Sequence, residues 1–243
     1  MQLIHEILGP PLYRLTAQET QDVLLAADDL HGFFVDVDLD TPRTLIFTGV
    51  RSLHAHLRST EGGYLEVLGH RQQPTGGYYL GRVRLTPPAQ DGSLSFSGYT
   101  CEYPKAGEIW RRWASAEPVT YGEWAGYPDS YHESWLHVVQ NAWFTADRQG
   151  KLGGTSEVVA LDGGRITTKA GLYCALGEAV NGPGGYFGSN LDALYDCLRS
   201  SRAEPLFRVQ WADFATSRRA LGVQYMTSLL SIFDEFRVGV TRG

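Results

Sequence analysis

The apolar residues near position 190 recur at the spacing of one helical face. From position 191 to 198 they lie three or four residues apart, which is the period of an amphipathic helix. Ser189 or Asn190 is the expected N-cap, because either side chain can accept a hydrogen bond from a free N–H group of the first turn. The pattern therefore predicts a helix over 191–199. Its expected buried stripe consists of Leu191, Leu194, Tyr195 and Leu198.

The polar positions of this helix carry two acids. Asp192 and Asp196 are four residues apart, so their carboxylates point the same way from a face beside the stripe. Asp192 lies in the first turn, where the helix dipole favours a negative charge by roughly 0.3–1 kcal/mol. Like charges at this spacing repel each other by a few tenths of a kcal/mol. A partner that carries guanidinium or ammonium groups would relieve that repulsion.

The segments on either side of this helix alternate between strand and helix patterns. A continuous apolar run at 158–161 ends at Asp162-Gly163, which is typical of a buried strand followed by a turn. Residues 167–180 predict a helix, and residues 205–211 predict a second strand. A last helix is expected to end at Glu235.

Residues 1–150 have mainly strand patterns. Strands are expected at 31–38, 44–50, 79–85 and 94–99, and Pro42 separates the first two. In the third of these strands the residues alternate between apolar and basic. The inward residues are expected to be Val83 and Leu85, and the outward residues Arg82 and Arg84.

Two segments of this part have more than one interpretation. Residues 13–15 and 23–26 fit either a β-hairpin or a helix that is capped by Thr16, with Glu19 completing a capping box. Residues 135–144 fit either a strand or a helix.

The chain is long enough for two ordinary domains. A cluster of glycine and polar residues at 149–155 is the expected linker. The expected domains are therefore 1–150 and 156–243. The helical spacing of Ile109, Trp110 and Trp113 adds a helix to the first of them.

The charge of the chain argues against one class of function and is unevenly distributed. The net charge of −6 disfavours a nucleic-acid binder that works by neutralising phosphates. Residues 1–150 contain eighteen acids and eleven bases, whereas residues 156–243 contain nine of each. A cationic partner would therefore be attracted mainly by the first part, within a Debye length of about 8 Å.

Several features indicate a cytoplasmic protein. No apolar run approaches the roughly 18 residues that would span a membrane. The first six residues have neither the basic start nor the apolar core of a secretory signal. The three cysteines, an odd and small number, suit a reducing compartment.

Two clusters of potential metal ligands occur in residues 1–150. Asp36, Asp38 and Asp40 share one face of a predicted strand, but no calcium-binding loop of the known spacing surrounds them. His54 and His56 offer two ligands, but a third is missing at any motif spacing. An acidic strand face and surface histidines are the favoured interpretations, so we expect neither a metal nor a cofactor.

An aromatic-rich loop over 121–135 is a candidate catalytic or binding cleft. It contains Asp129, His132 and Glu133 among five tyrosines and tryptophans, and such a mixture can bind sugars or peptides. Packing at the edge of a core is the commoner role of such a cluster. The aromatic residues are Tyr121, Trp124, Tyr127, Tyr131 and Trp135.

One segment is similar to a known family. Residues 186–198 read Tyr-Phe-Gly-Ser-Asn-Leu-Asp-Ala-Leu-Tyr-Asp-Cys-Leu. Together with the order of strands and helices over 156–243, this segment resembles barstar, the intracellular inhibitor of the ribonuclease barnase. The resemblance implies a short parallel sheet packed with helices. The chain as a whole is then expected to be α+β, with a barstar-like α/β domain after a β-rich domain.

The resemblance also implies a set of partner-binding residues. In barstar, one helix and the loop before it plug the nuclease active site, and their carboxylates meet the basic side chains that would hold RNA phosphate. Carried over, Asp196 is the central phosphate mimic, Asp192 its partner, and Glu235 a further acidic contact. Tyr186 is expected to stack on the nuclease. The other members of the expected set are Phe187, Gly188, Asn190 and Tyr195.

The implied function is stoichiometric inhibition of an extracellular or toxin-type ribonuclease, for example by an immunity protein. Such a protein would be no enzyme and would bind neither nucleic acid nor membrane directly. Ser201 stands where barstar has a tryptophan, and Arg199 and Arg202 flank it. These bases favour an alternative, a protein-interaction module that keeps the fold and binds a partner other than a nuclease. A third hypothesis is an enzyme whose site lies in the aromatic loop.

Overall fold

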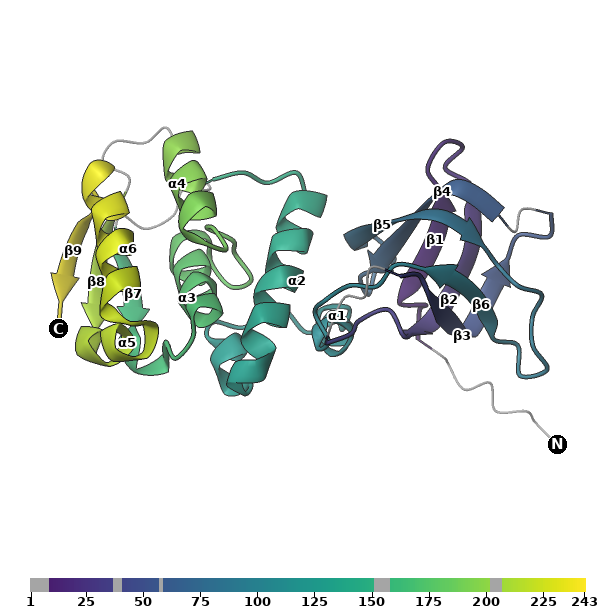
Figure 1. The fold of residues 1–243 in the computed structure, drawn as a ribbon, viewed down its shortest axis with the longest axis horizontal. Coiled ribbons are helices and arrows are strands. Elements are labelled where there is room, and N and C mark those ends of the chain that lie inside the picture. Colours follow the sequence, from purple (N-terminus) through teal and green to yellow (C-terminus); the bar gives the residue numbers. More distant parts are fainter. Residues whose placement is uncertain (1–8, 37–40, 57–58, 151–157, 202–206) are drawn as a thin grey trace. The chain divides into compact units, whose positions relative to one another are not determined.

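The computed structural model describes residues 9–36, 41–56, 59–150, 158–201 and 207–243. The chain divides into two compact units, Met1–Glu117 and Pro118–Gly243 (Figure 1). By packing, residues 118–150 therefore group with the C-terminal unit, whereas the sequence patterns place them in the N-terminal domain. Most of the expected linker at 149–155 lies outside the described residues.

The N-terminal unit is built on a curled antiparallel sheet of six strands in the order β5-β4-β1-β2-β3-β6 (Figure 1). The period of two expected of a half-buried sheet is clearest in β6, which buries Leu94, Phe96 and Gly98 and leaves the residues between them more exposed. The strands are β1 Tyr13–Ala17, β2 Val23–His31, β3 Arg43–Leu53, β4 Ser59–Leu68, β5 Pro74–Arg84 and β6 Leu94–Gly98.

Strands β1 and β2 decide between the two interpretations of the first segment. They pair antiparallel, with Tyr13 opposite Ala27 and Leu15 opposite Leu25, so the hairpin forms and the capped helix does not. Tyr13 and Leu15 are fully buried on the same face of the sheet. Burial at every second residue stabilises a strand, because a helix would turn these two side chains to different sides.

The strand predicted at 31–38 is wrong over residues 32–36. Strand β2 ends at His31, and Gly32 follows with a φ of 79°, a left-handed conformation that interrupts the extended chain. Phe34 then forms only an isolated bridge with Cys101. Asp38 and Asp40 lie outside the described residues.

The other strands and the helix predicted for this unit are present. Val83 and Leu85 are buried, and Arg82 and Arg84 are exposed. The predicted helix is α1, Ala106–Trp113, and the indole N–H of its Trp110 donates to the Tyr78 hydroxyl on β5 at 2.7 Å.

The C-terminal unit contains a parallel sheet in the order β7-β8-β9 with helices packed on it (Figure 1). The predicted strands and helices of this part are present. Residues 135–144 belong to a helix, and a short last strand pairs with β8. The elements are α2 His132–Thr145, β7 Val158–Asp162, α3 Lys169–Asn181, α4 Leu191–Ser200, β8 Arg208–Ala212, α5 Phe214–Leu221, α6 Val223–Glu235 and β9 Gly239–Arg242.

Helix α3 is the central element of this unit. It packs against both β7 and α2, and ten of its thirteen residues are buried. Its N-cap Thr168 accepts a hydrogen bond from the N–H of Gly171 at 2.9 Å, which satisfies one of the free donors of the first turn.

Glu178 of α3 is a buried acid that connects two segments. Its Oε2 accepts hydrogen bonds from the backbone N–H of Gly122 at 2.9 Å and from the indole N–H of Trp124 at 3.2 Å. Burial raises the pKa of Glu178 to about 7, although these donors lower it in part. The carboxyl group therefore holds the segment before α2 against α3.

The pKa of Glu178 predicts how stability changes with pH. The carboxyl loses its proton near pH 4.5 when unfolded but only near pH 7 when folded. Between these values the folded state binds more protons, so its stability is highest below pH 4.5 and falls as the pH rises toward 7. Glu178→Gln keeps an oxygen for both donors and removes the ionisation. We expect the variant to lose less stability over this window.

Urea unfolding followed through hydrogen exchange of the α3 amides at about pH 5 and about pH 8 measures this effect within the C-terminal unit. Glu133→Gln is the matched control, because Glu133 is an exposed acid on α2. Equal pH dependence in the Glu178 variant and the wild type would contradict the prediction.

A candidate partner-binding face on helix α4

Helix α4 begins as the sequence predicts. The side chain of Asn190 is the N-cap and accepts a hydrogen bond from the N–H of Ala193 at 2.8 Å. Leu194 and Leu198 are buried. Leu191 and Tyr195, the other two residues of the expected stripe, are only half-buried at its edges. The helix therefore keeps one face in the core and leaves its remaining surface open to a partner.

The loop before α4 is held by contacts with the end of α3 and with the first turn of α4. The side-chain amide of Asn181, at the end of α3, donates to the carbonyl oxygen of Tyr186 at 2.8 Å and to that of Gly150 at 3.0 Å. Gly188 has a φ of 97°, and a Cβ atom there would lie 2.8 Å from the Cα atom of Leu194. The backbone of the loop thus lies directly on the first turn of α4, where only glycine fits.

The two aromatic residues of the loop point inward. The side chain of Tyr186 is 4% exposed, its ring meets that of Phe144 edge-on at 5.5 Å, and its hydroxyl donates to Ser189 at 3.3 Å. Phe187 is fully buried and meets Phe207 edge-on at 5.7 Å. Both rings therefore support the loop from within the core, and neither offers a large exposed surface for stacking.

The acids of α4 lie on its exposed side. Asp192 is exposed, and the side chain of Asp196 is 66% exposed. One oxygen of Asp196 accepts a hydrogen bond from the guanidinium of Arg199 at 2.9 Å. The central acid of the expected site is thus paired within its own helix.

Glu235 is brought to α4 from the end of α6. The hydroxyl of Tyr195 donates to Oε1 of Glu235 at 2.8 Å, and the Tyr195 ring meets Phe236 edge-on at 4.9 Å. This hydrogen bond and the charge of Glu235 raise the pKa of Tyr195. Residues forty positions apart are therefore neighbours. We call the set Asp192, Tyr195, Asp196 and Glu235 the carboxylate face.

A groove beside this face was not expected from the sequence. It has a volume of about 510 Å³ and lies between α2 and α4. The periodicity of α2 identified a core segment but gave no sign that one end of it borders α4. The walls of this α2–α4 groove include Trp143, Phe144, Tyr186, Asp196, Cys197 and Arg199.

Cys197 is not activated for nucleophilic chemistry. Burial, with a smaller contribution from the nearby charge of Asp196, raises the pKa of its thiol to about 11. The thiol is therefore protonated at neutral pH, and a protonated thiol is a poor nucleophile.

The aromatic loop lies at the edge of the core, with Trp124 and Trp135 buried and Tyr121 58% exposed. His132 is 2% exposed, its Nδ1 lies 2.8 Å from the Thr168 hydroxyl, and its ring meets Trp124 edge-on at 5.1 Å. Burial lowers the pKa of His132, so its ring is neutral at physiological pH. Asp129 accepts a hydrogen bond from the Thr167 hydroxyl at 2.7 Å. These contacts attach the start of α2 to the start of α3.

Metal ligands do not gather in the part of the chain that the structure describes. No group of three His, Cys, Asp or Glu side chains there could hold an ion. His54 and His56 lie with their ring centroids 6.5 Å apart, and both are at least partly exposed.

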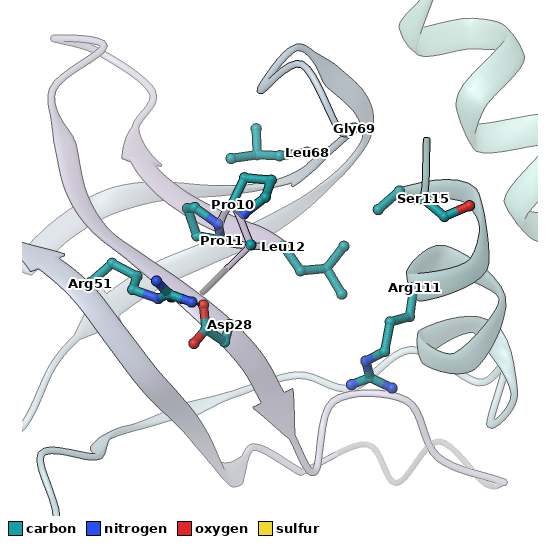
Figure 2. Close-up of a pocket in the computed structure, with 11 residues that line it drawn as sticks. Pro10, Pro11, Leu12, Asp28, Arg51, Leu68, Gly69, Arg111 and Ser115 are labelled. Carbon is teal, nitrogen blue, oxygen red and sulfur yellow. Dashed lines mark hydrogen bonds and ion pairs between the residues drawn. The ribbon is translucent and has the colours of Figure 1, made fainter. Parts of the chain in front are cut away.

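The N-terminal unit has a smaller pocket of about 280 Å³ (Figure 2). Arg51 forms an ion pair with Asp28 at 2.7 Å. Arg111 extends from α1 and forms an ion pair with Asp29 of β2 at 2.8 Å. Each guanidinium is already paired with a carboxylate, which leaves little excess positive charge for an anion. The apolar part of the wall includes Pro10, Pro11, Leu12 and Leu68.

The comparison with protein families concerns the C-terminal part of the chain. Residues 156–241 match the family model described as Barstar (barnase inhibitor). The C-terminal part of the chain is therefore a barstar-like domain, and the match contains all four residues of the carboxylate face. Helix α2 and the N-terminal unit lie outside it. A search of curated proteins found no match. No helix among the described residues has the length and hydrophobicity needed to cross a membrane.

The close approach at Gly188 predicts a local effect of substitution. Gly188→Ala places a methyl group against the backbone of Leu194, and we expect a cost of about 1–3 kcal/mol from overpacking beyond the strain of the positive φ. Hydrogen exchange should accelerate most at the amides in the first turn of α4.

Gly182→Ala is the matched control for this substitution. Gly182 also has a positive φ, 83°, but a Cβ atom there would meet nothing within 4 Å. The control should loosen the end of α3 and leave α4 protected. Equal protection of α4 in both variants would show that the contact with Leu194 is unimportant.

Proposed function

We propose that the protein inhibits a ribonuclease stoichiometrically, and that Asp192 and Asp196 occupy the positions of RNA phosphates in its active site. Glu235 adds a third carboxylate beside them. The description of the matching family, barnase inhibitor, supports this proposal, as does the exposure of all three acids. We infer that the partner is an extracellular or toxin-type enzyme, against which a cytoplasmic inhibitor would serve as an immunity protein.

The contact between Tyr195 and Glu235 carries this proposal. A single pair of acids on an exposed helix is common and needs no partner. Here a third acid from a distant segment is held beside them by a hydrogen bond of 2.8 Å. A ribonuclease binds a chain of phosphates with several cationic groups, so a face with several carboxylates is a suitable mimic.

Carboxylates can replace phosphates in this role for a simple reason. Both groups accept paired hydrogen bonds from arginine and attract lysine and protonated histidine. The excess of acids in residues 1–150 would further attract a cationic enzyme and increase its association rate.

The bond between Arg199 and Asp196 must give way to the enzyme. Both side chains are about two-thirds exposed, and an exposed ion pair stabilises a protein by only about 0.2–1 kcal/mol. A guanidinium of the enzyme that is shielded from water on binding would interact more strongly with Asp196. Arg199 therefore lowers the affinity without preventing binding.

Titration against a panel of barnase-like ribonucleases, with RNA cleavage as the readout, tests the proposal. Asp192→Ala and Asp196→Ala should each reduce the free energy of binding by about 2–5 kcal/mol, which is the general cost of truncating one member of a buried charge pair. Measurements on the barnase–barstar interface are among those that define this range.

Glu133→Ala is the control, because it removes an exposed acid of the same unit from outside the carboxylate face. It should inhibit as the wild type does. Full inhibition by both aspartate variants would refute the phosphate-mimic role.

The pairing of Asp196 with Arg199 favours a second candidate function, that of an interaction module with a partner other than a nuclease. Because Arg199 already pairs with Asp196, the carboxylate face attracts a strongly cationic enzyme less than three unpaired acids would.

Salt dependence separates the two functions. For a phosphate-mimicking face, the association rate should fall steeply as ionic strength rises from about 0.05 to 0.5 M, and less steeply in Asp196→Ala. Stopped-flow measurement with whichever partner binds provides this rate. A rate independent of salt would favour the interaction module.

A further inference from the structure

The α2–α4 groove is continuous with the carboxylate face. Asp196 belongs to both, since it is a member of the face and also borders the groove. A protein that covers Asp196 would therefore also lie over the groove. The groove is outside the family match on its α2 side, because that match begins at residue 156.

The wall on the α2 side is aromatic and partly open. Phe144 is 55% exposed, which is unusual for so large an apolar side chain, and its ring rests edge-on against Tyr186. Trp143 lies deeper and is 2% exposed. The thiol of Cys197 is protonated and adds no charge to the opposite wall. The groove thus combines aromatic rings with one carboxylate, that of Asp196, which Arg199 of the same wall pairs with in the free protein.

The aromatic wall already accepts a cation from its own chain. The guanidinium carbon of Arg148 lies 5.4 Å from the centroid of the Trp143 ring, within the range of a cation–π contact. On the other side of the groove, the guanidinium of Arg199 binds Asp196. Each wall therefore includes a side chain that contacts a guanidinium group of this chain.

We propose that the groove receives one arginine or lysine side chain of the protein that binds the carboxylate face. The stem of this side chain lies along Phe144, and its cationic head pairs with Asp196 in place of Arg199. The chemistry of the groove supports this occupant by itself, and only the identity of its carrier as a ribonuclease rests on the proposed function.

This contact assigns a role to α2. The barstar-like domain supplies the acid, and a helix from outside the match supplies the aromatic surface. Phe144 then acts as a specificity residue, because it favours partners with a cationic side chain at one defined position beside the site of Asp196.

A small cationic probe tests the groove without any nuclease. Nα-acetyl-arginine amide is titrated into the full-length ¹⁵N-labelled protein up to about 50 mM, since one cation–π contact and one ion pair give a dissociation constant in the millimolar range. The indole resonance of Trp143 and the amides of Phe144 and Cys197 should shift together and saturate. The citrulline analogue, which has the same shape without the charge, should leave them unchanged.

Variants separate the two walls. Arg199→Ala should bind the probe about two- to fivefold more tightly, because an exposed ion pair no longer competes. Phe144→Leu keeps an apolar side chain but removes the ring, and Asp196→Asn removes the charge; each should abolish saturable binding. Asp192→Asn is the matched control, since Asp192 is an acid of the same helix that does not line the groove.

The outcomes distinguish this inference from the proposed function. Arg199→Ala is the variant expected to bind the probe most tightly. If its resonances show no saturable shift, the groove does not bind a cationic side chain, whether or not a ribonuclease is inhibited. If the probe binds but no ribonuclease is inhibited, the result supports cation binding in the groove and argues against a ribonuclease as the partner. If a nuclease is inhibited, Phe144→Leu should weaken that inhibition, but less than Asp196→Ala does. Unchanged inhibition by Phe144→Leu would overturn the proposed contact in the groove.

Discussion

The close packing of the loop before α4 is the constraint on which the candidate site depends. Gly188 brings the loop backbone against Leu194, and Asn181 holds the carbonyl oxygen of Tyr186. These contacts fix where α4 starts and how it is rotated. Because the helix cannot turn about its axis, Leu194 and Leu198 stay in the core, and the aspartates on the remaining surface stay exposed.

The same unit uses buried polar contacts to join segments that the family match separates. Glu178 binds Gly122 and Trp124, and His132 lies within hydrogen-bond distance of Thr168. An ionised acid is costly to bury, which explains why the pKa of Glu178 is raised and why its donors are needed. Through these contacts α2 and the segment before it pack with the barstar-like domain, and α2 thereby comes to border α4.

Two opposing electrostatic effects act on the carboxylate face. Exposed acids attract a cationic partner, but several like charges on one small surface also repel one another. Arg199 and Tyr195 reduce that repulsion by donating to Asp196 and Glu235. Since the side chain of Arg199 is about two-thirds exposed, a partner can replace it at small cost, whereas Tyr195 is half-buried and stays beside Glu235. The free protein thus keeps its acids in defined positions without burying them.

The local elements of the C-terminal part and the family they resemble could be predicted from the sequence alone. The cap at Asn190, the apolar spacing of α4 and the strand before α3 are encoded within a few neighbouring residues, where periodicity and hydrogen-bonding capacity suffice. The sequence left the first hairpin and residues 135–144 open and predicted a strand at 31–38 where β2 ends at His31, since burial and backbone conformation depend on the rest of the fold. Only the tertiary structure decided that Tyr186 and Phe187 point inward, that Glu235 reaches Tyr195, that Arg199 pairs with Asp196, and that α2 borders α4. These relations depend on how distant segments pack and on which rotamers that packing allows, and no pattern along the chain records either.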